Sequence, residues 1–147
     1  MSQQNINISD NLASVHSKIA EIWKNISRDP AEITLIAVSK RKPVENIISA
    51  LDSNCHNFGE NYIQEAQQKH EQLQEKPEYS DKAKIHFIGS VQTNKVKYLT
   101  KFCDLLHSLD RQSLAEALQK RLEFEGKNME CLIQVNTSGE ESKSGIT

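Results

Sequence analysis

The chain alternates between segments whose apolar residues recur every three to four positions and short runs that are almost entirely apolar. The first segment, about residues 9–27, has helical spacing, and Ser9 or Asp10 can cap the helix that this spacing predicts. The first run, residues 33–39, is rich in Ile, Val and Thr. That composition predicts a strand buried on both faces, and Lys40 follows this strand directly.

Helical patterns separate four further apolar runs, so strands and helices alternate along the chain. The predicted strands are residues 33–39, 55–58, 84–88, 102–108 and 129–135. Pro43 is predicted to open the first helix between strands, Asp110 to cap the last one and Gly126 to end it. This order, with its short connections, predicts a parallel α/β domain rather than a series of hairpins.

The helix predicted after the second strand has an unusually polar composition. Its apolar side is predicted to contain Ala66, His70 and Leu73, which lie at helical spacing. The stretch of residues 64–78 is rich in Gln, Glu and Lys. This composition predicts a solvated helix face rather than a tail or a linker.

The carboxyl ends of the predicted strands carry polar residues and glycines. Right-handed crossovers bring these ends to one edge of a parallel sheet, where α/β proteins keep their ligand sites. The residues at this edge are Lys40, residues 59–61, Gly89, Ser90, His107, Ser108 and Asn136. We therefore expect a site here, although a lysine at a strand end can also simply mark where the strand reaches solvent.

A lysine among polar groups at this edge suits chemistry on a carbonyl group. The amine must lose its proton before it attacks an aldehyde. Partial burial and neighbouring positive charge both favour a neutral amine, and Arg41 and Lys42 supply such charge. Lys40 can then form a Schiff base with pyridoxal 5′-phosphate (PLP) or with a sugar aldehyde.

The other candidates for chemistry have weaker support. His86 fits a core or edge histidine better than a catalyst, and His107 is better placed but has no evident carboxylate or nucleophile partner. Residues 139–145 contain two glycines and Lys143. This loop can hold an anion through backbone N–H groups, although it lacks the spacing of a nucleotide-binding loop.

Composition excludes several classes of function. With 18 Lys and Arg against 20 Asp and Glu, the formal charge of −2 disfavours binding to nucleic acid or to an anionic membrane. No apolar run is long enough to span a membrane, and the polar start resembles no secretory signal. The three cysteines are widely spaced and form no Cys-x-x-Cys pair, so we expect thiols in a reducing cytoplasm and no metal site.

Four short motifs occur in order along the chain, each at the end of a predicted strand. They are Ala37-Val38-Ser39-Lys40; Phe58-Gly59-Glu60-Asn61-Tyr62; His86-Phe87-Ile88-Gly89 with Gln92-Thr93-Asn94-Lys95; and Ile133-Gln134-Val135-Asn136 with Ser142-Lys143-Ser144-Gly145. With these motifs, the chain resembles the pyridoxal phosphate homeostasis proteins, a YggS-like group related to the N-terminal domain of alanine racemase. The resemblance extends over residues 33–145.

The resemblance implies a (β/α)8 TIM barrel preceded by a helix, in which Lys40 holds PLP as a Schiff base. It also implies that Asn61 and His86 lie near the cofactor ring, and that Lys42 and Lys143 are accessory basic residues. The implied function is cytoplasmic PLP homeostasis without an assigned catalytic activity. PLP-dependent apoenzymes are the implied recipients of the cofactor.

The length of the chain departs from the family pattern. A (β/α)8 barrel takes about 250 residues, whereas five strands are predicted within these 147 residues. Strands six to eight and the late phosphate cup of the family have no counterpart. We therefore expect residues 1–147 to form one partial PLP-binding barrel domain, the truncated N-terminal part of the fold, with a leading helix at about 9–27 and βα units at about 33–147.

Two alternatives stay open at this point. A PLP-dependent racemase or decarboxylase, or a Schiff-base aldolase, needs a second acid or base opposite Lys40, and the sequence offers no convincing one. An inactive truncated fragment that acts only as an interaction module is favoured by the missing phosphate cup.

Overall fold

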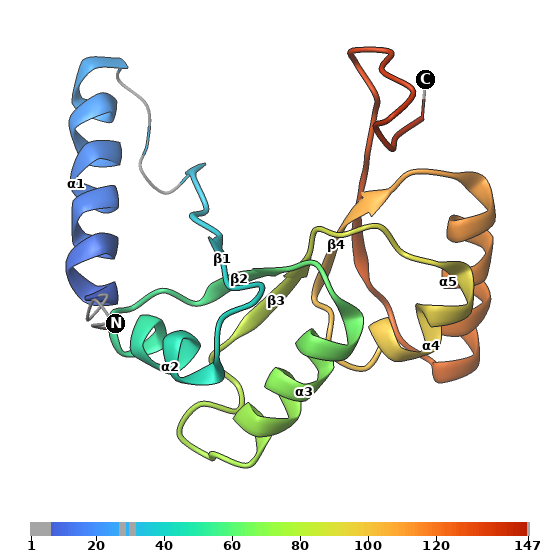
Figure 1. Ribbon diagram of the computed structural model, residues 1–147, viewed down its shortest axis with the longest axis horizontal. Helices are drawn as coiled ribbons and strands as arrows, with labels where there is room; N and C mark the ends of the chain where they lie inside the picture. The colour runs from blue at the N-terminus through green and yellow to red at the C-terminus, as the bar shows by residue number, and fades with distance from the viewer. Residues whose placement is uncertain (1–6, 27–28, 30–31, 147) are drawn as a thin grey trace, which may run out of the picture.

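A computed structural model describes residues 7–26, 29 and 32–146 of the chain (Figure 1). Its elements, in order, are α1 (Ile8–Ile26), β1 (Ala37–Val38), α2 (Val44–Asp52), β2 (Asn57–Glu60), α3 (Ile63–Gln74), β3 (Lys84–Phe87), the 3₁₀ turn η2 (Thr93–Lys95), α4 (Val96–Leu99), β4 (Leu105–Leu109), α5 (Gln112–Glu125) and β5 (Glu130–Ile133). Residue 27, the expected end of the first helix, lies outside the described residues.

The described strands form one parallel sheet in the order β1-β2-β3-β4-β5. This arrangement confirms the predicted α/β class. The strand order is the same as that of the first five strands of a (β/α)8 barrel, in which sequential strands are neighbours. Helices α2, α3, α4 and α5 follow one another along the outer side of the sheet (Figure 1). None of the described helices combines the length and the apolar character needed to cross a membrane.

The hydrophobic core lies between the sheet and these outer helices. Successive strand residues point to opposite faces, so alternate residues of each strand enter the core. The best-buried apolar side chains, at most 1% exposed, include Ile47, Phe58, Leu73, Ile85, Phe87, Leu99, Leu106 and Leu114. They come from β2, β3 and β4 and from the helices that cover them, and they set the position of each strand end.

The first strand differs from its prediction. β1 is confined to Ala37–Val38, and the side chains of Ile33 and Val38 are 44% and 52% exposed. Ala37 packs against the core, whereas Val38 lies on the opposite, inner face of the sheet. The expectation of a strand buried on both faces is therefore wrong, because the outer helices cover only one face.

The ends of α5 show one confirmed and one wrong prediction. Gly126 ends the helix with φ of 62°, the left-handed conformation that favours glycine, and the Lys127 N–H returns to the Leu122 carbonyl. Asp110 does not cap the start. Its carboxylate instead pairs with Arg111 at 2.6 Å, and Arg111 is the N-cap residue, which makes no side-chain capping bond.

Candidate functional site

Strand register determines which residues share a level on the inner face. Gly59 is paired with Val38 on one side and with His86 on the other, and His86 is paired with Leu105. Residues two positions apart on a strand share a face. Continuing this register by two residues leads to Lys40, Asn61, Ile88 and His107, one level nearer the carboxyl ends of the strands. We call these four residues the upper level. The register thus brings Lys40 and Asn61 to one level and leaves His86 one level below.

Lys40 is exposed and occupies a tight turn directly after β1. The Ser39 N–H donates to the Gly59 carbonyl at 3.0 Å, which extends the pairing of β1 with β2 by one residue. The Lys42 N–H then donates to the Ser39 carbonyl at 3.0 Å and closes the turn. Inside it, Arg41 has a φ of 60°, a left-handed conformation that costs a residue with a Cβ about 1–2 kcal/mol.

A buried cluster of charges lies beneath this turn. Glu60 is fully buried, and its Oε1 accepts hydrogen bonds from Ser39 Oγ and Lys69 Nζ, each at 2.7 Å. Lys69 Nζ also donates to the Ser39 carbonyl at 2.7 Å and to Glu65 Oε1 at 2.6 Å. The chain therefore stabilises the end of β1 with a buried ion network rather than with apolar packing alone.

The pKa of Glu65 reflects this network. Burial alone would raise the pKa of the carboxyl group. The hydrogen bond from Lys69, the hydrogen bond from the Arg41 backbone and the positive charges of both residues outweigh burial, so the pKa lies below its ordinary value. Glu65 is thus held as a carboxylate that accepts the Arg41 N–H at 2.5 Å.

Lys69 is a functional candidate that the sequence analysis missed. Ala66 and Leu73 are buried, as predicted for the apolar side of this helix, but Lys69 is buried with them and His70 is only partly buried. Spacings of three and then four residues put Lys69, rather than His70, in the middle of the buried stripe. The sequence does contain one indication that Lys69 is paired, because Glu65 and Lys69 have opposite charges at an i,i+4 spacing.

Asn61 lies against a glycine of the neighbouring strand end. A Cβ added at Gly89 would come within 2.3 Å of the Asn61 carbonyl oxygen and 2.9 Å of its Cα. Only glycine permits so close an approach of two backbones. The absence of a side chain at Gly89 therefore allows the backbone of Asn61 to lie close to the end of the neighbouring strand, next to Ile88.

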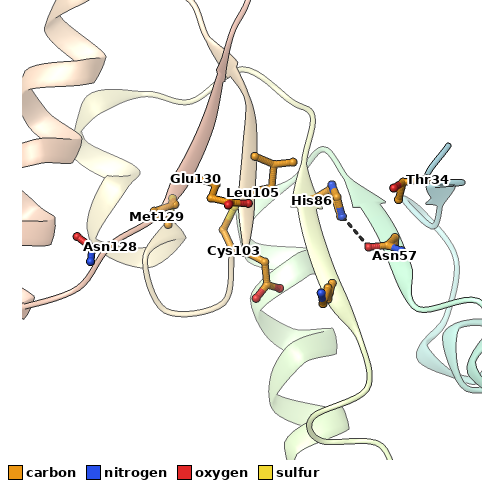
Figure 2. A pocket seen from close by; sticks show the side chains of 10 residues that line it. Thr34, Asn57, His86, Cys103, Leu105, Asn128, Met129 and Glu130 are labelled. Carbon is orange, nitrogen blue, oxygen red and sulfur yellow. Dashed lines mark hydrogen bonds between the residues drawn. The ribbon is translucent and has the colours of Figure 1, made fainter. Parts of the chain in front are cut away.

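His86 connects two levels of the inner face. Its Nε2 lies 3.0 Å from Asn57 Oδ1 (Figure 2), and its Nδ1 lies 2.9 Å from His107 Nε2. With the Asn57 oxygen as acceptor, His86 donates through Nε2 and accepts from His107 through Nδ1. Burial, followed by the nearby charge of His107, lowers the pKa of His86, which favours this neutral form.

His107 belongs to the upper level, whereas the predicted ring contact His86 does not. The partner that the structure gives His107 is another histidine, His86, which lies 21 positions earlier in the chain, and not a carboxylate or a nucleophile. A one-level difference depends on register, and the register is visible only once the strands are paired.

A hollow on the inner face lies away from Lys40. It has a volume of about 620 Å³ at the amino ends of the strands, and its lining residues are Thr34, Asn57, Lys84, His86, Cys103, Asp104, Leu105, Asn128, Met129 and Glu130 (Figure 2). Ligand sites of α/β barrels lie at the carboxyl ends instead. A second hollow, of about 490 Å³, borders Asn61, Ser90 and Lys95 near that edge. The larger hollow therefore lies on the inner face at the opposite ends of the strands from Lys40, and His86 is the one candidate site residue that lines it.

The two accessory lysines lie apart from each other. Lys42 borders hollows on the helix side of the sheet, one against α1 and α2 and the other against α3. Lys143 is exposed in the loop after β5. This loop, drawn in red in Figure 1, follows the outer strand on the other side of the described sheet from β1. Lys42 and Lys143 thus follow the two outer strands of the described sheet, β1 and β5.

The loop after β5 is closed by Asn136. Its Oδ1 accepts the Gly139 N–H at 3.0 Å, and its Nδ2 donates to the Glu140 carbonyl at 2.9 Å. The Lys143 N–H donates to the same Glu140 carbonyl at 3.0 Å. Because the loop uses these two backbone donors itself, the expected anion site made of backbone N–H groups is wrong at Gly139 and Lys143.

Comparison with known proteins places the chain in a family. The model of the alanine racemase N-terminal domain matches residues 11–147. A pyridoxal phosphate homeostasis protein of Vibrio alginolyticus is 40% identical over 141 residues, which are 95% of this chain and 60% of the relative. The counterpart in Escherichia coli K12 is 41% identical over 139 residues, which are 95% of this chain and 58% of the relative.

Solved structures agree with this result. PipY of Synechococcus elongatus PCC7942, solved with PLP bound, has a TM-score of 0.78 and 30% identity over 95% of this chain and 58% of PipY. The chain spans less than two thirds of the length of these relatives. The family model matches nearly the whole chain, and the chain therefore belongs to the alanine racemase N-terminal domain family.

Proposed function

We propose that the chain binds PLP through Lys40 and takes part in PLP homeostasis without catalysing a reaction. The observation that carries this proposal is the exposed Lys40 on the same level as Asn61, at the carboxyl ends of the strands of a parallel sheet, in a family with a member solved with PLP bound. Bound PLP supplies an aldehyde that condenses with a primary amine and releases water. Lys40 is the amine that we assign to this role.

The side chains that we assign to the cofactor fit it chemically. PLP carries an aldehyde, a pyridine ring with polar substituents, and a phosphate. A primary amine, an amide and cationic side chains are the donors that such a molecule needs. We assign Lys40 to the aldehyde, Asn61 and His86 to the ring, and Lys42 and Lys143 to accessory positive charge.

The relatives support a role in homeostasis rather than in catalysis. The similar proteins of Vibrio alginolyticus and Escherichia coli carry the name of cofactor homeostasis and not of a reaction. We propose the cytoplasm as the compartment, since the three cysteines are free thiols. PLP-dependent apoenzymes are the proposed recipients, and reactivation of such an apoenzyme by the PLP-loaded chain measures this transfer.

One observation favours a second candidate, a PLP-dependent racemase or decarboxylase. His107 lies in the upper level with Lys40 and has an imidazole that can move a proton. Its Nε2 is engaged by His86 at 2.9 Å, which argues against a free catalytic base. Exchange of the α-hydrogen of amino acids with solvent, dependent on His107, would support the enzyme over the carrier.

A titration of the full chain with PLP tests the main proposal. Wild type is expected to develop a saturable visible absorption band, and Lys40→Ala is expected to lack it. Lys120→Ala, an exposed lysine of α5, is the matched control and should retain the band. An equal band in Lys40→Ala would overturn the assignment.

A further inference from the structure

Lys69 is a buried lysine to which the cofactor chemistry assigns no role. It is 5% exposed, and its Nζ donates to the Ser39 carbonyl, to Glu60 and to Glu65 at 2.6 to 2.7 Å. An ammonium group has three N–H donors, so these contacts use all of them. Lysine is almost never buried unless it is paired. Lys69 is therefore fixed in place by its hydrogen bonds and is not merely covered by its neighbours. We call Lys69 and its three partners, Ser39, Glu60 and Glu65, the hub.

The partners of Lys69 hold the residues on both sides of Lys40. Ser39 precedes Lys40, and its carbonyl accepts both Lys69 Nζ at 2.7 Å and the Lys42 N–H at 3.0 Å. Glu65, held by Lys69, accepts the N–H of Arg41, which follows Lys40. The hub thus reaches the turn at its start and at its middle.

The strained residue of the turn depends on the same support. Arg41 has a φ of 60°, which a residue with a side chain adopts only when its surroundings enforce it. Glu65 accepts its backbone N–H, and its guanidinium donates to Tyr62 Oη at 3.1 Å and lies 5.6 Å from the centre of that ring. These contacts come from α3 and from the residue that precedes it, as the Lys69 contacts do.

We propose that Lys69 is a positioning residue for Lys40: through Ser39, Glu60 and Glu65 it holds the turn so that the Lys40 amine leaves the sheet on the inner face. This inference rests on the proposed function. It deepens that function by naming the buried group that prepares the binding lysine. The competing explanation is that Lys69 only neutralises Glu60 inside the core. That role would change global stability without changing the turn.

The test needs a variant that folds. Lys69→Met alone leaves Glu60 buried without a counter-charge, and Glu60 Oε2 already has no hydrogen-bond partner among the described residues. The double variant Lys69→Met/Glu60→Gln removes both charges and keeps side chains of similar size. Lys120→Met, an exposed lysine of α5, is the matched control.

Two measurements on the full chain are compared. The first is amide hydrogen exchange at Arg41 and Lys42 without cofactor, with the core amide of Leu106 as the internal reference. The second is the rate at which PLP becomes attached to Lys40, followed by absorbance. The double variant is expected to exchange at Arg41 and Lys42 at least tenfold faster, with Leu106 unchanged, and to attach PLP at least tenfold more slowly. The control is expected to match wild type in both.

The outcomes separate the two claims. Unchanged exchange at Arg41 and Lys42 in the folded double variant would overturn the positioning role, as would unchanged attachment despite faster exchange. If exchange rises equally at Leu106, Lys69 acts on the whole fold and the positioning role is again wrong. If wild type attaches no PLP, the proposed function fails, and the exchange comparison alone decides whether Lys69 holds the turn.

Discussion

Lys69 Nζ lies 2.7 Å from the carbonyl oxygen of Ser39, the residue immediately before Lys40. This contact joins a buried charge on α3 to the end of β1, two elements 30 residues apart in the chain. It explains how a strand of only two residues ends in a defined turn. The conformation around Lys40 is therefore set from the helix side of the sheet, while Lys40 itself is exposed.

The lowered pKa of Glu65 predicts acid sensitivity of the turn. A carboxyl group whose pKa is lower in the folded state stabilises that state above the unfolded pKa of about 4.3 and loses the contribution as pH falls through the folded pKa. The amide chemical shift of Arg41, which donates to Glu65, should therefore titrate with a midpoint below about 4.3. Glu65→Gln should abolish this titration. A midpoint at or above the ordinary value would show that Lys69 and Arg41 do not hold the carboxylate.

The lowered pKa of His86 predicts a different pH window. The unfolded chain binds a proton at His86 below about pH 6.5, while the folded chain resists it, so stability rises with pH across the window below 6.5. The urea concentration at the unfolding midpoint of wild type should decrease as the pH is lowered from about 7 to about 5.5. His86→Gln should make this fall smaller. His16→Gln, on the exposed surface of α1, is the control and should leave the fall unchanged. An equal fall in His86→Gln would assign the pH dependence to other groups.

The close approach of Asn61 to Gly89 predicts a large effect of one methyl group. Gly89→Ala would bring a Cβ within 2.3 Å of backbone that cannot move freely, and we expect destabilisation of about 1–3 kcal/mol in urea unfolding. Gly59→Ala is the matched comparison. The nearest atoms to its Cβ would be in the side chains of Ile36, Val38 and Ile88 at 3.3 Å, which can shift. A Gly59→Ala effect as large as that of Gly89→Ala would contradict this account.

Much of the fold is predictable from local pattern. The alternation of apolar runs and helical spacing predicted the parallel order of the strands, and Gly126 predicted the end of α5. Strand limits were less accurate, since β2 begins at Asn57 rather than at residue 55. Apolar runs show where a chain prefers burial, while the length of a strand depends on what its neighbours pair with.

Local sequence pattern predicts that Lys40 follows a strand, but it does not predict the network that surrounds it. Lys40 follows a run that is rich in β-branched residues, and this position alone identifies it as a candidate. Lys69 was missed because a lysine in a polar helix is normally solvated, and its burial depends on Glu60, which comes from a neighbouring strand. His107 shares a level with Lys40 because of strand register, and a shift of one residue would have moved it to the other face. Information of this kind lies in pairings between distant segments and not in local pattern.

The central claim is that Lys40 is the residue to which PLP becomes attached, and borohydride reduction of the PLP-loaded full chain tests it most directly. Reduction fixes the pyridoxyl group on its lysine, and peptide mass mapping then identifies the position. The account predicts the added mass on Lys40, with the neighbouring Lys42 unmodified. Added mass on Lys42 or on another lysine, with Lys40 unmodified, would contradict it.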